Sequence, residues 1–196
     1  MIERSHYGAI ITAAGESSRM GCPKALMPFN GLPLVDHQIA CLRGFGQIVV
    51  VTGCDGDEVV SHVGRSLCAH NENFALGRSH SIEVGARMLR DDLKGAVVVG
   101  VDQPLVTEIL VEMLMRFDPA CDRIAVPVMN GKKGHPLLFS STLFPHLRRC
   151  SSFDAGLRGI LKQSADLIHE IRVYDERIFA DLNEPEDIAA AEPFWP

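Results

Sequence analysis

Short apolar runs separated by helix-forming segments recur along the chain, and this alternation constrains the fold more than any other feature. Each run is rich in Val, Ile and Ala and is too short for a buried helix, which is typical of a strand that is buried on both faces. Strands that alternate with helices form βαβ units, in which the strands are parallel. The predicted strands are Tyr7–Ala14, Gln47–Thr52, Gly95–Val101, Arg123–Val128 and Leu167–Val173.

Composition and charge exclude several classes of protein. The chain is 46% hydrophobic and 22% charged, so it can bury a sizeable core, and its length suits one domain over residues 1–196. A formal net charge of −6 with no basic block argues against a nucleic-acid partner. No apolar run reaches the roughly 20 residues of a membrane helix, and the first residues are too polar for a signal peptide. We therefore expect a cytoplasmic protein without a membrane partner.

A loop rich in glycine and serine follows the first predicted strand. It reads Ala-Ala-Gly-Glu-Ser-Ser-Arg-Met-Gly-Cys-Pro-Lys from Ala13 to Lys24. Small residues let a ligand approach the backbone, exposed amides can bind phosphate oxygens, and Arg19 and Lys24 add two cations. The spacing fits neither a Walker loop nor the G-x-G-x-x-G dinucleotide motif. The loop therefore predicts a different kind of phosphate site, with a surface loop carrying incidental charges as the alternative.

This segment resembles the A-A-G-x-S-x-R-M-G-x-P-K signature of the MobA-like nucleotidyltransferase family, and within it the molybdenum cofactor cytidylyltransferases. The resemblance implies a three-layer, Rossmann-like α/β nucleotidyltransferase fold whose mostly parallel sheet holds one antiparallel strand. It also implies that Ala13, Ala14 and Gly15 line the base and ribose side of a nucleotide, and that Arg19 and Lys24 hold its triphosphate.

Two acidic segments resemble the metal-binding motifs of the same family. Asp102 begins Asp-Gln-Pro-Leu-Val at the end of a predicted strand, where a hard oxygen ligand would suit Mg²⁺. The second ligand of the family corresponds to Asn183, whose amide oxygen binds the metal more weakly than a carboxylate does; Asp181 is the alternative. Without the resemblance, Asp102 would simply form a turn before Pro104, and the second segment would be the acidic start of a helix.

Two further segments receive a role from the resemblance. Gly77 and Ser81 correspond to residues that approach the nucleotide base, although a serine here could instead cap a helix. Gly134, His135 and Pro136 match a G-H-P element that we assign to acceptor binding, with a hairpin tip as the alternative.

Together these features predict transfer of a nucleotidyl group. Lys24, Arg19 and Asp102 would carry the catalysis with Mg²⁺, as an acceptor phosphate attacks the α-phosphorus and pyrophosphate leaves. The resemblance implies CTP as donor, a molybdopterin-type acceptor, and a molybdoenzyme as possible client. Two alternatives stay open, namely a different acceptor such as a sugar phosphate, and a non-catalytic chaperone for molybdenum cofactor.

Overall fold

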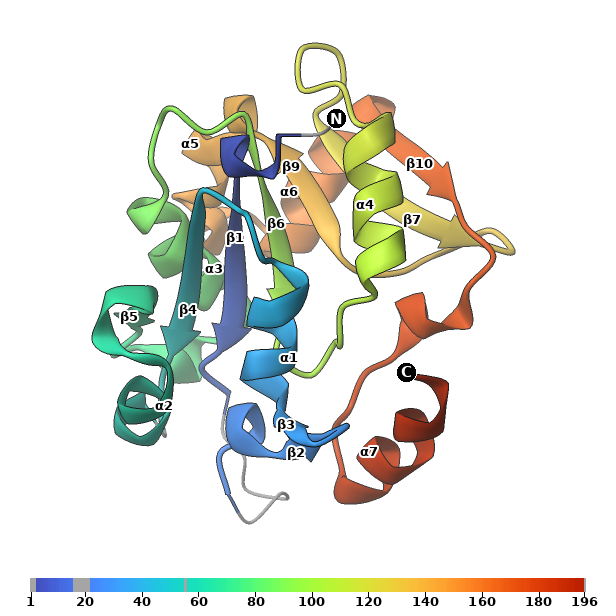
Figure 1. The fold of residues 1–196 in the computed structure, drawn as a ribbon. Helices are drawn as coiled ribbons and strands as arrows, with labels where there is room; N and C mark the ends of the chain where they lie inside the picture. Colours follow the sequence, from blue (N-terminus) through green and yellow to red (C-terminus); the bar gives the residue numbers. More distant parts are fainter. Residues whose placement is uncertain (1–2, 16–21, 55, 196) are drawn as a thin grey trace.

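One mixed sheet forms the centre of the molecule (Figure 1). The computed structural model describes residues 3–15, 22–54 and 56–195. The strand order is β10-β7-β9-β6-β1-β4-β5, and the short β8 pairs with β7. The strands are β1 Tyr7–Ala13, β4 Gln47–Thr52, β5 Cys68–His70, β6 Gly95–Gly100, β7 Ile124–Met129, β8 Lys132–Lys133, β9 Leu137–Ser140 and β10 Ile168–Arg172. Each of the five predicted strands is therefore present.

The direction of the strands brings several segments of the predicted site to one end of the sheet. Strand β1 lies between β4 and β6 and is parallel to both, and β7 is parallel to β10. Strand β9 lies between β6 and β7 and is antiparallel to both, so it is the antiparallel strand within the sheet order; β8 adds a second antiparallel pairing with β7. Because β9 is antiparallel to β6 and β7, the segment before it lies at the end of the sheet where the carboxyl ends of β1, β6 and β7 are found.

Helices cover both faces of this sheet, which gives the expected three layers (Figure 1). Successive residues of β1 face opposite sides, so that Ile11 belongs to one hydrophobic core and Ile10 to the other. Helices α1 (Leu34–Cys41) and α4 (Thr107–Arg116) pack on the side of Ile11, and α3, α5 and α6 pack on the side of Ile10. The remaining bounds are α2 Gly56–Val63, α3 Arg78–Met88, α5 Phe144–Leu147, α6 Leu157–Gln163 and α7 Pro185–Ala191.

Some short elements have no counterpart in the predicted pattern. Strand β5 has only three residues, and β2 (Pro28–Phe29) and β3 (Leu32–Pro33) form a separate two-stranded sheet. Elements of this length carry too few residues for a periodic signal. Across the described ranges, no helix combines the length and the apolar character that crossing a bilayer requires.

Candidate functional site

The turn after β6 carries Asp102 and is fixed by one buried glutamine of α1. Gln38 is fully buried, and its Nε2 donates to the carbonyl oxygens of Gly100 at 2.9 Å and Gln103 at 2.8 Å. Its Oε1 accepts from the backbone N–H of Leu105 at 3.0 Å. Buried backbone groups need such partners, so this amide holds the turn in one conformation and thereby sets the position of Asp102.

Three of the predicted residues meet at the end of the sheet. The Lys24 ammonium lies 3.6 Å from Oδ2 of Asp102 and donates to Oδ1 of Asn183 at 3.1 Å. Lys24 and Asp102 are largely buried, with side chains 17% and 29% exposed. The backbone N–H of Leu182 donates to the carbonyl oxygen of Asp102 at 2.8 Å, which fixes the segment of Asn183 beside the turn. The cluster therefore combines a cation with two oxygen ligands of the kind that Mg²⁺ accepts.

Asp181 belongs to the same neighbourhood. Its pKa is raised by burial and by the negative charge of Asp102, while its hydrogen bond with Asn183 and the charges of Lys24 and Arg78 lower it. Two carboxylates that repel each other at this range would both gain from a divalent cation. Asp181 and Asn183 both remain candidates for the second metal ligand. In the part of the chain that the structure describes, no three His, Cys, Asp or Glu side chains form a metal-binding group.

A cavity of about 160 Å³ opens beside Asp102 and contains most of the residues predicted for the nucleotide. Gly77 precedes α3 with a φ of +93°, a conformation that glycine adopts without strain, and no side chain caps the helix. Helix α3 begins at Arg78, so the alternative of a serine cap is wrong. Ser81 instead accepts a hydrogen bond from Asn71 at 3.0 Å. The lining residues are Thr12, Ala14, Gly15, Phe74, Gly77, Arg78, Ser81 and Asp102.

The other residues predicted for the nucleotide are Ala13, Arg19 and Lys24. Ala13 is the last residue of β1, directly before the lining residues Ala14 and Gly15. Arg19 lies outside the described residues. Lys24 does not line the cavity but contacts Asp102, which does.

The Gly134-His135-Pro136 segment lies against the same turn. A Cβ at Gly134 would overlap Ile178, so only glycine fits there, and the backbone N–H of His135 donates to the carbonyl oxygen of Ile178 at 2.9 Å. The His135 side chain reaches Gln103, with 2.7 Å between the two Nε2 atoms. The structure therefore joins this segment to the residue that follows Asp102, rather than leaving it as an isolated hairpin tip.

The hydrogen bonds around Gln103 assign the protonation state of His135. Oε1 of Gln103 accepts from the backbone N–H of Gly100 and from Arg78, and both are donors only. Nε2 of Gln103 must then donate to Nε2 of His135, which makes the imidazole neutral with its proton on Nδ1. Burial lowers the pKa of His135 to about 4, the charge of Arg78 also lowers it, and Asp102 opposes both.

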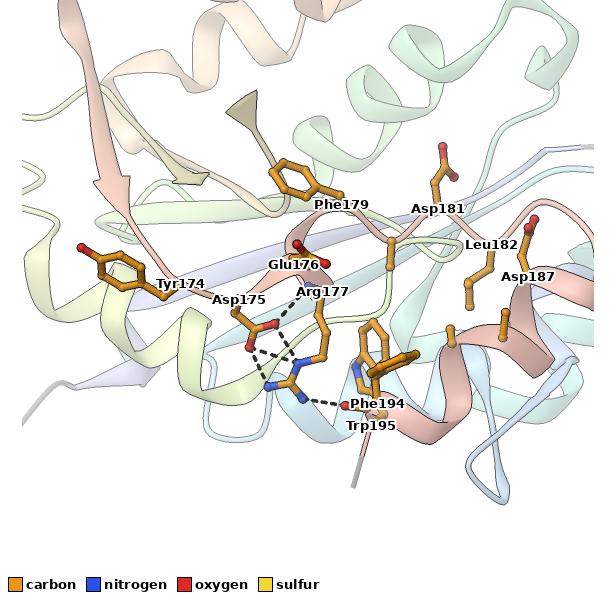
Figure 2. A pocket seen from close by; sticks show the side chains of 13 residues that line it. Tyr174, Asp175, Glu176, Arg177, Phe179, Asp181, Leu182, Asp187, Phe194 and Trp195 are labelled. Carbon is orange, nitrogen blue, oxygen red and sulfur yellow. Dashed lines mark hydrogen bonds and ion pairs between the residues drawn. The ribbon is translucent and has the colours of Figure 1, made fainter. Parts of the chain in front are cut away.

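A second cavity, of about 610 Å³, lies between the 174–182 segment and the C-terminal residues (Figure 2). Arg177 forms part of its wall. The guanidinium donates to both carboxylate oxygens of Asp175 and to the carbonyl oxygen of Phe194, the last at 3.2 Å. Figure 2 shows the carboxylate of Asp181 pointing away from Arg177 and Phe194. The sequence assigned no role to this cavity, and its wall also carries the segment that leads to Asn183.

Comparison with known proteins adds to this geometry. The model of the MobA-like NTP transferase domain matches residues 9–168, which include most of β1, the turn of Asp102 and the Gly134–Pro136 segment. The chain belongs to the MobA-like NTP transferase family. The fold of this MobA-like chain is therefore that of a family of NTP transferases.

Relatives of this MobA-like protein carry different names. The nicotine blue oxidoreductase of Paenarthrobacter nicotinovorans is 26% identical over 194 residues, covering 91% of this chain and 93% of the relative. The molybdenum cofactor cytidylyltransferase of Escherichia coli is also 26% identical over 194 residues, covering 95% and 96%. The crystal structure of Rv0371c from Mycobacterium tuberculosis H37Rv superposes with a TM-score of 0.77 at 23% identity, covering 95% and 97%. The family match supports an NTP transferase, while the names of the two relatives do not agree on one activity.

Sequence reasoning assigned no role to four residues of this MobA-like site. Phe74 and Arg78 line the smaller cavity, and Gln38 and Gln103 hold the turn and its neighbours. Arg78 and Gln103 stand inside segments that the sequence did single out, so their polar character was a usable signal. Gln38 lies on a helix far from any motif, and only its full burial reveals its role.

Proposed function

We propose that the chain transfers a cytidylyl group from CTP to the phosphate of a molybdopterin-type acceptor and releases pyrophosphate. The observation that carries this proposal is the contact of Lys24 with both Asp102 and Asn183 beside the cavity that holds Gly15, Gly77 and Ser81. A cation and metal ligands next to a cavity with a glycine-lined wall provide what a transferring phosphate requires. The likeness to the E. coli cytidylyltransferase supports CTP and the molybdopterin-type acceptor.

A divalent cation belongs to this proposal. The donor set of Asp102, Asn183 and Asp181 consists of oxygen atoms, which suits Mg²⁺ or Mn²⁺ and not a metal that prefers sulfur. A structure of the M. tuberculosis protein Rv0371c is described as a complex with manganese, at 22% identity and a TM-score of 0.74, covering 95% of this chain and 98% of that chain. When bound, the cation would neutralise charge on the phosphates.

The residues of the chain then have separate tasks. Lys24 and Arg19 would bind the β- and γ-phosphates, which orients the triphosphate and stabilises the departing pyrophosphate. Ala13, Ala14, Gly15, Gly77 and Ser81 would hold the nucleoside. Gly134, His135 and Pro136 would position the acceptor. An acceptor phosphate with a second pKa of about 6 is largely dianionic at neutral pH, so it needs positioning more than deprotonation.

Pyrophosphate release tests the proposal. The protein is mixed with Mg²⁺, each of the four NTPs in turn, and molybdopterin or a panel of sugar phosphates. We expect pyrophosphate only with CTP and molybdopterin. Release with a sugar phosphate would identify the alternative acceptor, and binding of molybdenum cofactor without any release would favour the chaperone.

A further inference from the structure

The side chain of Gln103 is a fixed point between the two halves of the site. Gln103 is only 5% exposed, and both polar atoms of its amide have partners. Oε1 accepts from the Gly100 backbone at 3.1 Å and from Nη2 of Arg78 at 2.8 Å, while Nε2 contacts His135 at 2.7 Å. Because Gly100 is the last residue of β6, the sheet itself sets the position of this amide. The guanidinium of Arg78 is therefore hydrogen-bonded to a group whose position is fixed.

Most of the hydrogen-bonding capacity of Arg78 is still available. A guanidinium carries five N–H donors. Within residues 3–15, 22–54 and 56–195, the side chain of Arg78 forms only the hydrogen bond to Gln103, and it has no carboxylate within ion-pair distance. It nevertheless lines the 160 Å³ cavity together with Asp102. A cation that a neutral amide holds at the wall of a cavity, with no described carboxylate in direct ion-pair contact, is suited to bind an anion.

The start of helix α3 adds to the positive potential at this wall. Arg78 is the first residue of the helix, Gly77 is its N-cap, and no side chain in the described part of the chain accepts from the N–H groups of Arg78 and Ser79. Unsatisfied N–H groups at a helix N-terminus favour an anion. Gly77 and Ser81 line the same cavity, so the end of the helix and the guanidinium face one space.

We propose that Arg78 binds the α-phosphate of the nucleotide and that Gln103 is the positioning residue that holds the guanidinium there. This inference rests on the proposed function. Ala14, Gly15 and Ser81, which the proposed function assigns to the nucleoside, line the same cavity as Asp102, which it assigns to the metal. Arg78 lies three residues before Ser81 on α3 and donates to Gln103, the residue after Asp102, so it is joined to both groups. The α-phosphate is the part of the nucleotide that joins the nucleoside to the metal-bound phosphates.

The same position suits the reaction. An oxygen of the acceptor phosphate forms a bond to the α-phosphorus while the bond from that phosphorus to the bridging oxygen breaks, and the electron pair leaves with pyrophosphate. With a dianionic acceptor, no proton is transferred. Negative charge is concentrated on the non-bridging oxygens of the α-phosphate, where a guanidinium can donate two parallel hydrogen bonds. Through Gln103, Arg78 is also linked to His135, on the side from which the acceptor would come.

A ligand series locates the phosphate that Arg78 binds. Affinities for cytidine, CMP and CTP, each with Mg²⁺, are measured by calorimetry in the native protein and in Arg78→Gln. We expect the affinity for CMP to fall roughly 10- to 100-fold in Arg78→Gln, because charge-assisted hydrogen bonds are lost, while the affinity for cytidine is unchanged. Arg78→Lys should recover part of the loss. Arg116→Gln, which alters a surface arginine paired with Glu112, should bind all three ligands normally.

The outcomes separate this inference from the proposed function. If the native protein binds CTP and Arg78→Gln binds CMP equally well, the role of Arg78 is wrong and the proposed function stands. An equal loss for cytidine and CMP would also overturn it, because Arg78 would then shape the nucleoside end. A native protein that binds none of the four NTPs would overturn both. If another NTP binds in place of CTP, the series is run with its nucleoside and monophosphate, and the same criteria apply.

Gln103→Glu tests the positioning role with Arg78 still present. The new carboxylate can still accept from Gly100, but it forms an ion pair with Arg78 and withdraws its charge from the phosphate. We expect the affinity for CMP to fall as in Arg78→Gln, and the pKa of His135, measured by NMR, to rise from about 4 because a carboxylate replaces the amide beside it. Normal CMP affinity together with an unchanged His135 titration would overturn the assignment of Gln103.

Discussion

Lys24 donates a hydrogen bond of 3.1 Å to Oδ1 of Asn183, although 159 positions separate the two residues in the chain. Lys24 follows the loop after the first strand, and Asn183 lies just before the last helix. This bond therefore joins two parts of the site that come from opposite ends of the chain. Asp102 lies 3.6 Å from the same ammonium. A change of charge at any of the three residues therefore alters the electrostatic environment of the other two.

Removal of the ammonium should abolish most of the turnover. In Lys24→Ala we expect a loss of about 3–4 kcal/mol in transition-state stabilisation, because a cation that contacts the transferring phosphates no longer acts. Steady-state kinetics of pyrophosphate release measures it. Lys162→Ala, at an exposed position of α6, is the control and should behave as the native protein does. Unchanged turnover in Lys24→Ala would remove this lysine from the mechanism.

The metal assignment predicts opposite results for two conservative changes. Asp102→Asn should abolish Mg²⁺-dependent activity, because it removes a carboxylate ligand. Asn183→Asp should preserve or raise activity, since it supplies a second carboxylate and a charged partner for Lys24. Titration of activity against Mg²⁺ concentration distinguishes the two. Full activity of Asp102→Asn at low Mg²⁺ would place the metal elsewhere.

Gln38 should contribute to stability more than a helix residue usually does. Gln38→Met keeps the approximate volume but leaves the carbonyl groups of Gly100 and Gln103 and the N–H of Leu105 without their partner. The free energy of unfolding should fall by about 3 kcal/mol, because buried polar groups lose their hydrogen bonds. Urea denaturation measures this change, and Gln163→Met at an exposed position is the control. A change below about 1 kcal/mol would mean that the turn does not need this amide.

The parts of the fold that follow from local pattern were predictable. The apolar runs around Ile11 and Val98 had to be buried strands, and the glycine-rich loop after β1 had to lie at a strand end. Strand β5 was not predictable, because Cys68–His70 has no apolar run of its own and becomes a strand by pairing with β4. The antiparallel pairing of β9 with both β6 and β7 likewise depends on contacts between distant segments.

The site divides in the same way. Lys24, Asp102 and Ser81 belong to segments whose residue types and positions already indicated phosphate, metal or base binding. Gln38 did not stand out, because it lies on a helix outside every motif. Gln103 belongs to a motif in which the sequence assigned a role only to Asp102. Their importance arises from burial next to backbone groups that need partners, which exists only once α1, α3 and β6 are packed together.

His135 should act on the acceptor and not on the nucleotide. It lies in the segment before β9, and its side chain contacts Gln103, which does not line the nucleotide cavity. In His135→Ala we expect the KM for the acceptor to rise roughly 10-fold or more, as positioning is lost, with CTP affinity nearly unchanged. Kinetics with each substrate varied in turn measures both. An equal loss for both substrates, or a loss confined to CTP, would move His135 to the nucleotide side.

The neutral state of His135 predicts a specific loss of stability in acid. Its pKa is about 4 in the folded protein against an ordinary 6.5, because burial and the facing charge of Arg78 disfavour the proton more than the facing carboxylate of Asp102 attracts it. Below pH 6.5 the unfolded chain therefore takes up a proton that the folded protein does not bind. The resulting contribution to the free energy of unfolding is fully present above this pH and is lost progressively as the pH falls to about 4, up to a total of order 3 kcal/mol.

Urea midpoints at about pH 7.5 and about pH 4.5 should thus differ more in the native protein than in His135→Gln, whose side chain does not titrate. Carboxylates such as Asp181 titrate in both proteins, so the difference between the two isolates the imidazole. Equal pH dependence in both would mean that His135 is as easily protonated in the folded protein as in the unfolded chain, and that the amide of Gln103 does not hold it neutral.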